Sequence, residues 1–217
     1  MHKHNLLVDS VVVRFGSKTI LTGGYITSET GLVTGLLGRN GAGKSCMFRG
    51  LMGDLRVENV MVSIDGKPVD RQIIGKSVKY LPQGHLLPDS IKLRKAFEIY
   101  GVNYWTFVNL FPKYSRFHDS AIWELSGGEA RLAELYMVLY SDALFYILDE
   151  PFAQIDPISI GAVQQIIRER SRDHGIIVTD HNYDAISAVA DNLFVIADGY
   201  TSPVHGREDL VRHGYLK

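Results

Sequence analysis

The pattern of apolar and polar positions predicts a β-rich first part of the chain. Residues 6–38 contain three segments rich in apolar and β-branched residues that predict strands: "LLVDSVVVRF", "KTILTGGYIT" and "GLVTGLLG". The segment "VMVSIDGKPV" predicts a hairpin that turns at Asp65-Gly66, and "SVKYLPQ" predicts a short strand stopped by Pro82. Between them, residues 44–53 predict a helix that ends near Gly53.

The last part of the chain alternates between helical and strand-like patterns. Helices are predicted at residues 127–141, 157–173 and 183–190, and buried strands in "ALFYILD", "GIIVTD" and "NLFVIADG". Strands that alternate with helices form a parallel sheet with helices on both faces. The predicted fold class is therefore α/β.

Residues 84–124 have a different character, because they are rich in aromatic residues and predict several short helices. We interpret them as an inserted helical subdomain. A short insert has little core of its own, so we expect part of its large side chains to form an exposed patch, which commonly marks an interface. The alternative is that most of them pack within the subdomain. The side chains are Leu86, Leu87, Tyr100, Tyr104, Trp105, Phe107, Phe111 and Tyr114.

Composition narrows the classes of function. The 217 residues carry a formal net charge of −1, so no basic field is present to hold a nucleic acid backbone. The single cysteine, Cys46, excludes an internal disulfide and favours a reducing compartment. We therefore expect a globular protein that does not bind nucleic acid.

The stretch "GRNGAGKS" at residues 38–45 fits the phosphate-binding pattern G-x-x-x-x-G-K-[ST]. Glycines let successive N–H groups point inward, and the following helix presents its positive end to the same anion. Lys44 supplies a point charge for the β- and γ-phosphates, and Ser45 offers a hydroxyl to Mg²⁺. Because an apolar strand precedes the loop and a helix follows it, the sequence predicts a nucleotide site.

An acidic pair follows the buried strand "ALFYILD". Asp149 ends that strand, where a carboxylate can hold Mg²⁺ through water beside a phosphate loop. The next residue, Glu150, can orient or polarise an attacking water. A solvated turn is the alternative interpretation of such a pair.

The segment "LSGGE" at residues 125–129 contains a capping box formed by Ser126 and Glu129. Two glycines at a first helical turn weaken the helix by roughly 1 kcal/mol each. Something should therefore require a bare backbone there, and a second helix terminus that faces phosphate is the natural candidate.

Six motifs occur in the order found in one large family: "GRNGAGKS", "LPQG", "LSGGEAR", "YILDEP", "QIDP" and "VTDH". The chain resembles the ABC-type ATPases, the nucleotide-binding subunits of ABC transporters, over essentially its whole length. The resemblance implies a single domain at residues 1–217 with a P-loop NTPase core and a mixed, mainly parallel sheet. It also implies an N-terminal antiparallel β subdomain, a RecA-like core at residues 1–83 and 130–217, and a helical subdomain at about residues 84–129.

The resemblance implies ATP and Mg²⁺ as ligands and gives each matching residue a role. ATP contacts would come from an adenine-stacking Phe15 and from the phosphate loop, Gly38, Arg39, Asn40, Gly41, Ala42, Gly43, Lys44, Ser45 and Cys46. Catalysis would use Glu150, Gln83 and His181, and Mg²⁺ would be held by Ser45, Gln83 and Asp149.

The remaining roles concern a second subunit. The signature residues Ser126, Gly127, Gly128 and Glu129 would contact ATP held by that subunit, and Asp156 would lie at the dimer interface. The implied partners are a second copy or a paired ATPase subunit, together with integral membrane transporter subunits. The implied location is cytoplasmic, on the inner face of the cell membrane, and we expect residues 84–117 to dock there, linked to the ATP site by Gln83.

The segments "DEPFAQIDPISI" and "VTDHNYDAI" are most similar to the ATPases of lipopolysaccharide export, followed by those of branched-chain amino acid importers. Two features depart from the exporter pattern. Ser126 follows Gln83 by only 43 positions, and the arginine cluster typical after the signature is missing from "EARLAELYMVL". The resemblance therefore implies an ATP-hydrolysing subunit that drives a transporter, with a soluble ABC protein of translation, repair or regulation as the alternative.

Overall fold

The computed structural model describes residues 3–181 and 183–216. One ten-stranded sheet has the order β5-β4-β1-β2-β10-β9-β3-β8-β7-β6. One half of the sheet is made of β9 (Asn192–Ala197), β3 (Val33–Gly38), β8 (Gly175–Thr179), β7 (Phe145–Asp149) and, at the edge, β6 (Val78–Leu81). These five strands are mutually parallel, which confirms the α/β fold class.

The central parts of the parallel strands are buried on both faces. Successive side chains point to opposite faces of the sheet and so belong to two separate core clusters. In β7, Tyr146 and Leu148 belong to a cluster with the helices of one face. Phe145 and Ile147 belong to a cluster with the other face, where α1 (Lys44–Met52) and the N-terminal strands pack. The continuous apolar sequence of these strands is the consequence of burial on both sides.

The N-terminal strands form an antiparallel region: β1 (Asn5–Phe15), β2 (Lys18–Glu29), β4 (Asn59–Ile64) and β5 (Lys67–Pro68). The predicted hairpin is confirmed, since β4 and β5 are joined at Asp65 (φ 53°) and Gly66 (φ 72°), as a two-residue turn of this type requires. The sequence did not predict β10 (Tyr200–Val204), which pairs with β9 and, at Tyr200, with Gly23 of β2. This strand joins the antiparallel region to the parallel one in a single sheet.

The helices include α1, α2 (Arg71–Ser77), α3 (Leu93–Ile99), α4 (Tyr104–Leu110), α5 (Gly127–Tyr140), α6 (Pro157–Ser171), α7 (Tyr183–Ser187), α8 (Arg207–Arg212) and two 3₁₀ helices, η1 (Pro112–Phe117) and η2 (Ile122–Glu124). The predicted helices at 44–53, 127–141 and 157–173 are confirmed to within two residues at each end. The helix predicted at residues 183–190 is also present, as α7, but it ends three residues earlier, at Ser187. Helices α2 and α8 were not predicted.

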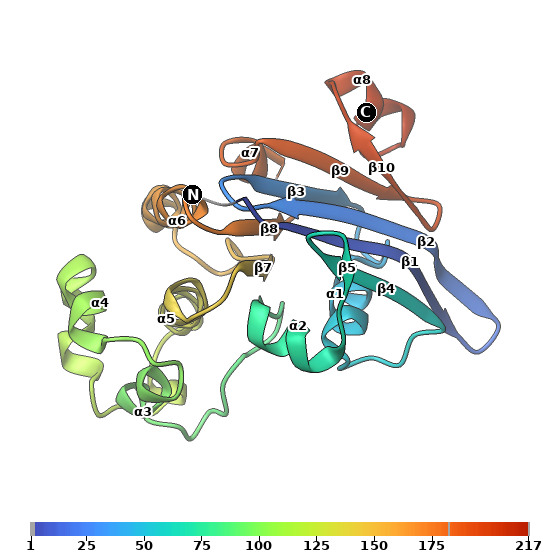
Figure 1. Cartoon of the computed structure of the whole chain (residues 1–217). Helices are drawn as coiled ribbons and strands as arrows, with labels where there is room; N and C mark the ends of the chain where they lie inside the picture. Colours follow the sequence, from blue (N-terminus) through green and yellow to red (C-terminus); the bar gives the residue numbers. More distant parts are fainter. Residues whose placement is uncertain (1–2, 182, 217) are drawn as a thin grey trace.

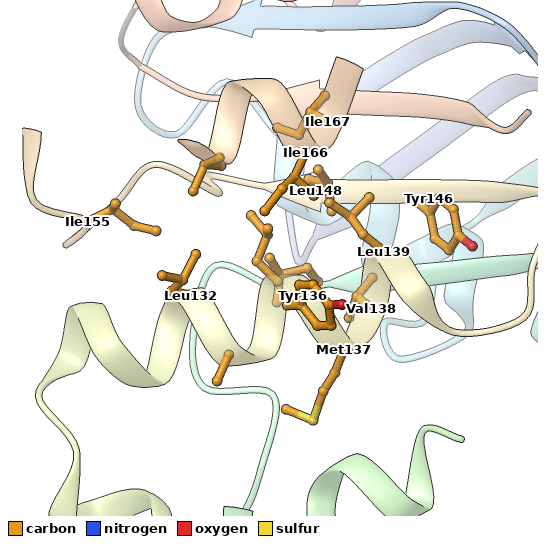
Figure 2. Packing of buried hydrophobic residues seen from close by; sticks show 14 of the residues in the cluster. Leu132, Tyr136, Met137, Val138, Leu139, Tyr146, Leu148, Ile155, Ile166 and Ile167 are labelled. Carbon is orange, nitrogen blue, oxygen red and sulfur yellow. The ribbon is translucent and has the colours of Figure 1, made fainter. Parts of the chain in front are cut away.

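Helix α5 connects the helical segment to the sheet. Figure 2 shows its Leu132, Tyr136 and Leu139 in one packed group with Leu148 of β7 and Ile166 of α6, and all belong to the same buried cluster. In Figure 1, α3 and α4 lie beyond α5, away from the strands. The helical segment is therefore anchored to the core through one long helix.

The expectation of a large exposed aromatic patch at residues 84–117 is wrong for most of its side chains. Tyr104, Phe107 and Tyr114 are buried, and the Phe107 ring lies 4.8 Å from that of Tyr136 on α5. The reason is that α5 supplies the core that the segment lacks by itself. The large apolar side chains that remain exposed in this region include Ile99, Trp105 and Leu110.

Candidate nucleotide-binding site

A pocket of about 410 Å³ brings together residues that are far apart in the sequence. Its lining comes from the phosphate loop, the end of β1, the start of β2, the segment after β6 and the turn after β7. The lining residues are Phe15, Lys18, Ile20, Asn40, Gly41, Ala42, Gly43, Lys44, Ser45, Cys46, Gln83 and Glu150. Phe15 is half-exposed and lines this pocket, so it is accessible to a base.

The phosphate loop connects β3 to α1 in a conformation that only glycine adopts easily. Gly41 (φ 80°) and Gly43 (φ 108°) are both left-handed, and a Cβ on Gly43 would lie 3.0 Å from Leu21. Gly43 is the N-cap of α1, and among the described residues no side chain caps this helix. Its first N–H groups are therefore available to an anion.

Lys44 is buried beneath this loop, where its Nζ donates to the carbonyl oxygen of Gly38 at 2.7 Å. Burial lowers the pKa of Lys44, while the negative charges of Glu150, Asp149 and Asp180 act in the opposite direction. The ammonium is thus held in the loop, surrounded by carboxylates.

Asp149 is fully buried at the end of β7, and its Oδ2 accepts a hydrogen bond from the Tyr80 hydroxyl at 3.0 Å. Burial raises the pKa of Asp149, and hydrogen bonds from the Ser45 and Tyr80 hydroxyls lower it in part. Sequence reasoning missed Tyr80. The available signal was a hydroxyl-bearing residue in a strand, β6, that pairs with β7.

Glu150 follows in a strained, left-handed conformation (φ 53°), fixed by a hydrogen bond from its N–H to the Thr179 carbonyl at 2.7 Å. Its Oε2 accepts from Gln83 Nε2 at 3.0 Å and lies 3.9 Å from His181 Nδ1. The structure therefore places Gln83 and His181 near the carboxylate of Glu150, although His181 lies closer to Asp180 (3.3 Å) and does not line the pocket in the described structure.

The donor set fits Mg²⁺ bound together with a nucleotide. Within residues 3–181 and 183–216, no group of three or more His, Cys, Asp or Glu side chains could hold a metal by itself. Asp149 Oδ1 is buried and has no hydrogen-bond partner among the described residues, so it can accept from a metal-bound water. With Ser45 and Gln83 it would offer a sparse set of oxygen ligands, which a Mg²⁺ ion would complete with water and phosphate oxygens.

The signature residues lie at the start of α5, outside the pocket as lined by the described residues. The capping box is present, because Ser126 Oγ accepts from Glu129 N at 3.3 Å and Glu129 Oε2 accepts from Ser126 N at 2.9 Å. A Cβ on Gly128 would lie 2.4 Å from the Gln154 carbonyl oxygen. One reason for the bare backbone is therefore a close contact within this chain.

Asp156 caps the N-terminus of α6, where it accepts from Ser159 N at 3.0 Å. The hydrogen bonds from Ser159 hold its pKa below the usual value. Like the signature residues, Asp156 is not among the residues that line the nucleotide pocket in the described structure.

Comparisons with known proteins agree with this geometry. Residues 23–153 match the family described as "ABC transporter". An uncharacterized ABC transporter ATP-binding protein of Rhizobium meliloti is 32% identical, with 93% of this chain and 80% of that protein aligned. The lipopolysaccharide export system ATP-binding protein LptB of Haemophilus influenzae is 27% identical, over 89% of this chain and 87% of that protein.

Solved structures show the same fold. The structure titled as the ATP binding subunit of an ABC transporter superposes with a TM-score of 0.81, covering 97% of this chain and 93% of that one at 19% identity. No helix in the described parts of the chain is both long and apolar enough to cross a bilayer. The chain therefore belongs to the ABC transporter family, as an ATP-hydrolysing, ATP-binding subunit.

Proposed function

We propose that this protein hydrolyses Mg²⁺-ATP in the 410 Å³ pocket and uses the energy to drive transport through separate membrane subunits. The observation that carries the proposal is the convergence of the phosphate loop, Gln83 and Glu150 on one pocket. A solvated acidic turn, the alternative interpretation of Asp149-Glu150, does not account for a fully buried Asp149.

In this proposal the phosphates lie against the loop of residues 38–46 and the open N-terminus of α1. Lys44 exchanges its bond to the Gly38 carbonyl for the β- and γ-phosphate oxygens, and adenine stacks on Phe15. Ser45, Gln83 and a water on Asp149 would hold Mg²⁺, and the bound ion would supply charge neutralisation on the phosphates.

Glu150 accepts a proton from the attacking water, which Gln83 helps to orient. His181 contacts the γ-phosphate from the other side of the carboxylate. The distances of 3.0 Å from Gln83 and 3.9 Å from His181 to Glu150 Oε2 support this division of roles.

The signature residues serve a second subunit. The start of α5 presents Ser126, Gly127, Gly128 and Glu129 away from the chain's own pocket, so a head-to-tail dimer with Asp156 at its interface would place them on the partner's ATP. In that dimer, each chain is a single ABC ATPase domain with a RecA-like core at residues 1–83 and 130–217 and a helical subdomain at about residues 84–129.

Membrane subunits dock in a groove of about 370 Å³ between the core and the helical segment. Tyr80 lines this groove and also bonds Asp149, and Pro82 and Leu86 lie on either side of Gln83 in the lining. Leu87 is buried, so it is unsuited to probing the surface. The half-buried Leu86 is the residue to test.

The substrate class we propose is a lipopolysaccharide-like molecule, as for LptB, the relative that is 27% identical. The segments "DEPFAQIDPISI" and "VTDHNYDAI", which are most similar to the ATPases of lipopolysaccharide export, support it. The segment between Gln83 and Ser126 is shorter than in exporter ATPases. It contributes to the surface that meets the membrane subunits and not to the ATP site, so the substrate class is independent of ATP hydrolysis.

Affinity purification of the tagged chain from detergent-solubilised membranes of its native cells tests the transport role. Integral membrane proteins should co-purify with the parent and with Met61→Glu, an exposed position on β4 outside the groove lining. Leu86→Glu should lose them and keep its ATP affinity. A parent that recovers no membrane protein would favour the soluble ABC alternative instead.

A further inference from the structure

Helix α5 carries a buried ion pair that the proposed catalytic roles leave unused. Arg131 is 6% exposed and Glu134 is 1% exposed, and Arg131 Nη1 lies 3.8 Å from Glu134 Oε2. Burying two charges is expensive, and well-packed apolar residues are often as stable in their place. A buried ion pair at this position therefore suggests a role that apolar residues could not fill, namely the formation of directional hydrogen bonds.

Arg131 directs its guanidinium at three backbone carbonyl groups. Nη1 donates to Pro82 at 2.6 Å, and Nη2 donates to Asp149 at 2.5 Å and to Glu150 at 3.0 Å. These carbonyls lie at the carboxyl ends of two neighbouring strands, β6 and β7. The planar fork of arginine can hold several acceptors in fixed directions, which the point charge of lysine cannot.

Glu134 continues the same network one turn further along α5. Its Oε1 accepts from Leu86 N at 2.9 Å and from Leu87 N at 3.3 Å. The pair therefore fixes the backbone on both sides of Gln83, through Pro82 before it and through Leu86 and Leu87 after it.

Both ends of the Gln83–Glu150 hydrogen bond depend on these contacts. Glu150 has a left-handed backbone (φ 53°), which the surrounding structure must hold in place. Arg131 binds the carbonyl of Glu150 itself and the carbonyl next to Gln83, so it fixes the two peptides whose side chains meet at 3.0 Å.

We propose that Arg131, oriented by Glu134, is a positioning residue for ATP hydrolysis that sets the relative placement of Glu150 and Gln83. It reaches these groups through their backbones and does not itself line the nucleotide pocket among the described residues. The inference rests on the proposed role of Glu150. It also gives the signature helix a rigid connection to the catalytic turn, because Arg131 lies two residues after Glu129.

The test is the initial rate of γ-labelled ATP hydrolysis by the purified chain, measured over a range of ATP concentrations in excess of the chain, with Glu150→Gln as the inactive reference. Arg131→Lys keeps the charge and loses the fork. Its rate at saturating ATP should fall at least about tenfold, since small misplacements of reacting groups cost that much or more. The ATP concentration at half-maximal rate should change less than about twofold, because the phosphate loop is untouched.

Two further variants separate positioning from general stability. Arg168→Lys, at a surface pair with Asp191 (2.8 Å), should leave the rate unchanged. Glu134→Gln keeps an oxygen for Leu86 and Leu87 and should lose much less rate than Glu134→Leu. Circular dichroism confirms that each variant compared is folded.

The outcomes are distinct. If the parent is no faster than Glu150→Gln, the role of Glu150 is overturned and this proposal with it. If the parent exceeds that reference and Arg131→Lys equals the parent, the role of Arg131 alone is overturned. A rise in the half-saturating ATP concentration that matches the loss of rate in Arg131→Lys, or equal losses of rate for Glu134→Gln and Glu134→Leu, would also overturn it.

Discussion

Helices α1 and α5 both have glycines at their starts, and their first turns are built in opposite ways. Helix α1 starts after Gly43 without a side-chain cap in the described structure, and its end opens into the pocket that contains Lys44. Helix α5 starts with a complete Ser126–Glu129 capping box and is covered by Gln154.

The difference shows that a glycine at a helix start has more than one physical cause. At α1 the glycines allow positive φ angles and leave N–H groups open to phosphate. At α5 the backbone of Gln154 approaches too closely for a side chain on Gly128. The phosphate-binding loop at α1 lies within one chain, whereas the start of α5 is capped by its own side chains and does not line the chain's own pocket in the described structure.

The largest expected effect is at α1. Lys44→Ala should weaken ATP binding by about 1.5–3 kcal/mol, because a charge-assisted contact to the phosphates is lost. Calorimetry with Mg²⁺-ATP measures this, and Ser126→Ala at the other helix start is the matched control, expected to bind ATP as the parent monomer does. Equal losses in the two variants would remove the distinction between the helices.

The next effect is at α5 and concerns stability. Gly128→Ala should lower the free energy of unfolding by about 1–3 kcal/mol, since its methyl group meets backbone that cannot move easily. Gly127→Ala should cost less, because its nearest neighbour at 2.2 Å is the mobile end of the Gln154 side chain. Urea unfolding compares the two; a larger loss for Gly127→Ala would show that the packing reason is wrong.

The smallest expected effect is a dependence of stability on pH, which arises from the Glu129 carboxylate at the start of α5. Burial acts to raise the pKa of Glu129, but hydrogen bonds from Ser126 and the charges of Lys113 and Arg116 outweigh it, so the pKa lies below 4.5. A carboxyl with a lowered folded pKa stabilises the protein above 4.5 and loses that contribution as pH falls through the folded value.

Thermal unfolding of the parent and Glu129→Gln from pH 7 to pH 3 measures this contribution. The parent should be more stable at neutral pH, and the difference should shrink in acid. A difference that stays constant across the range would mean that the Glu129 carboxylate does not stabilise the helix start.

Much of the fold follows from local patterns in the sequence. The buried strands β3, β7 and β8 are continuous apolar runs, and Asp65-Gly66 specifies its own turn. The sequence pattern does not predict helices α2 and α8, because each is no longer than seven residues. In addition, α2 contains Gly75, which disfavours a helix. Strand β10 contains Pro203, which argues against a strand until its place between β9 and β2 is known.

Only part of the site could likewise be predicted from the sequence. The phosphate loop and the acidic pair are each contiguous in the sequence, so their chemistry can be recognised from it. Tyr80 and Arg131 act through contacts that join separate elements, and no spacing along the chain encodes such contacts. The aromatic segment was misjudged for the same reason, because the burial of Phe107 depends on Tyr136 of α5.

The central claim is that the start of α5 completes the ATP site of a second copy. Light scattering of Glu150→Gln with Mg²⁺-ATP tests it most directly, since blocked hydrolysis should trap the closed dimer. The account predicts a particle of twice the 24.3 kDa chain mass, and a monomer when Ser126→Arg is added. A particle that stays at 24.3 kDa at high concentration with ATP bound would contradict it.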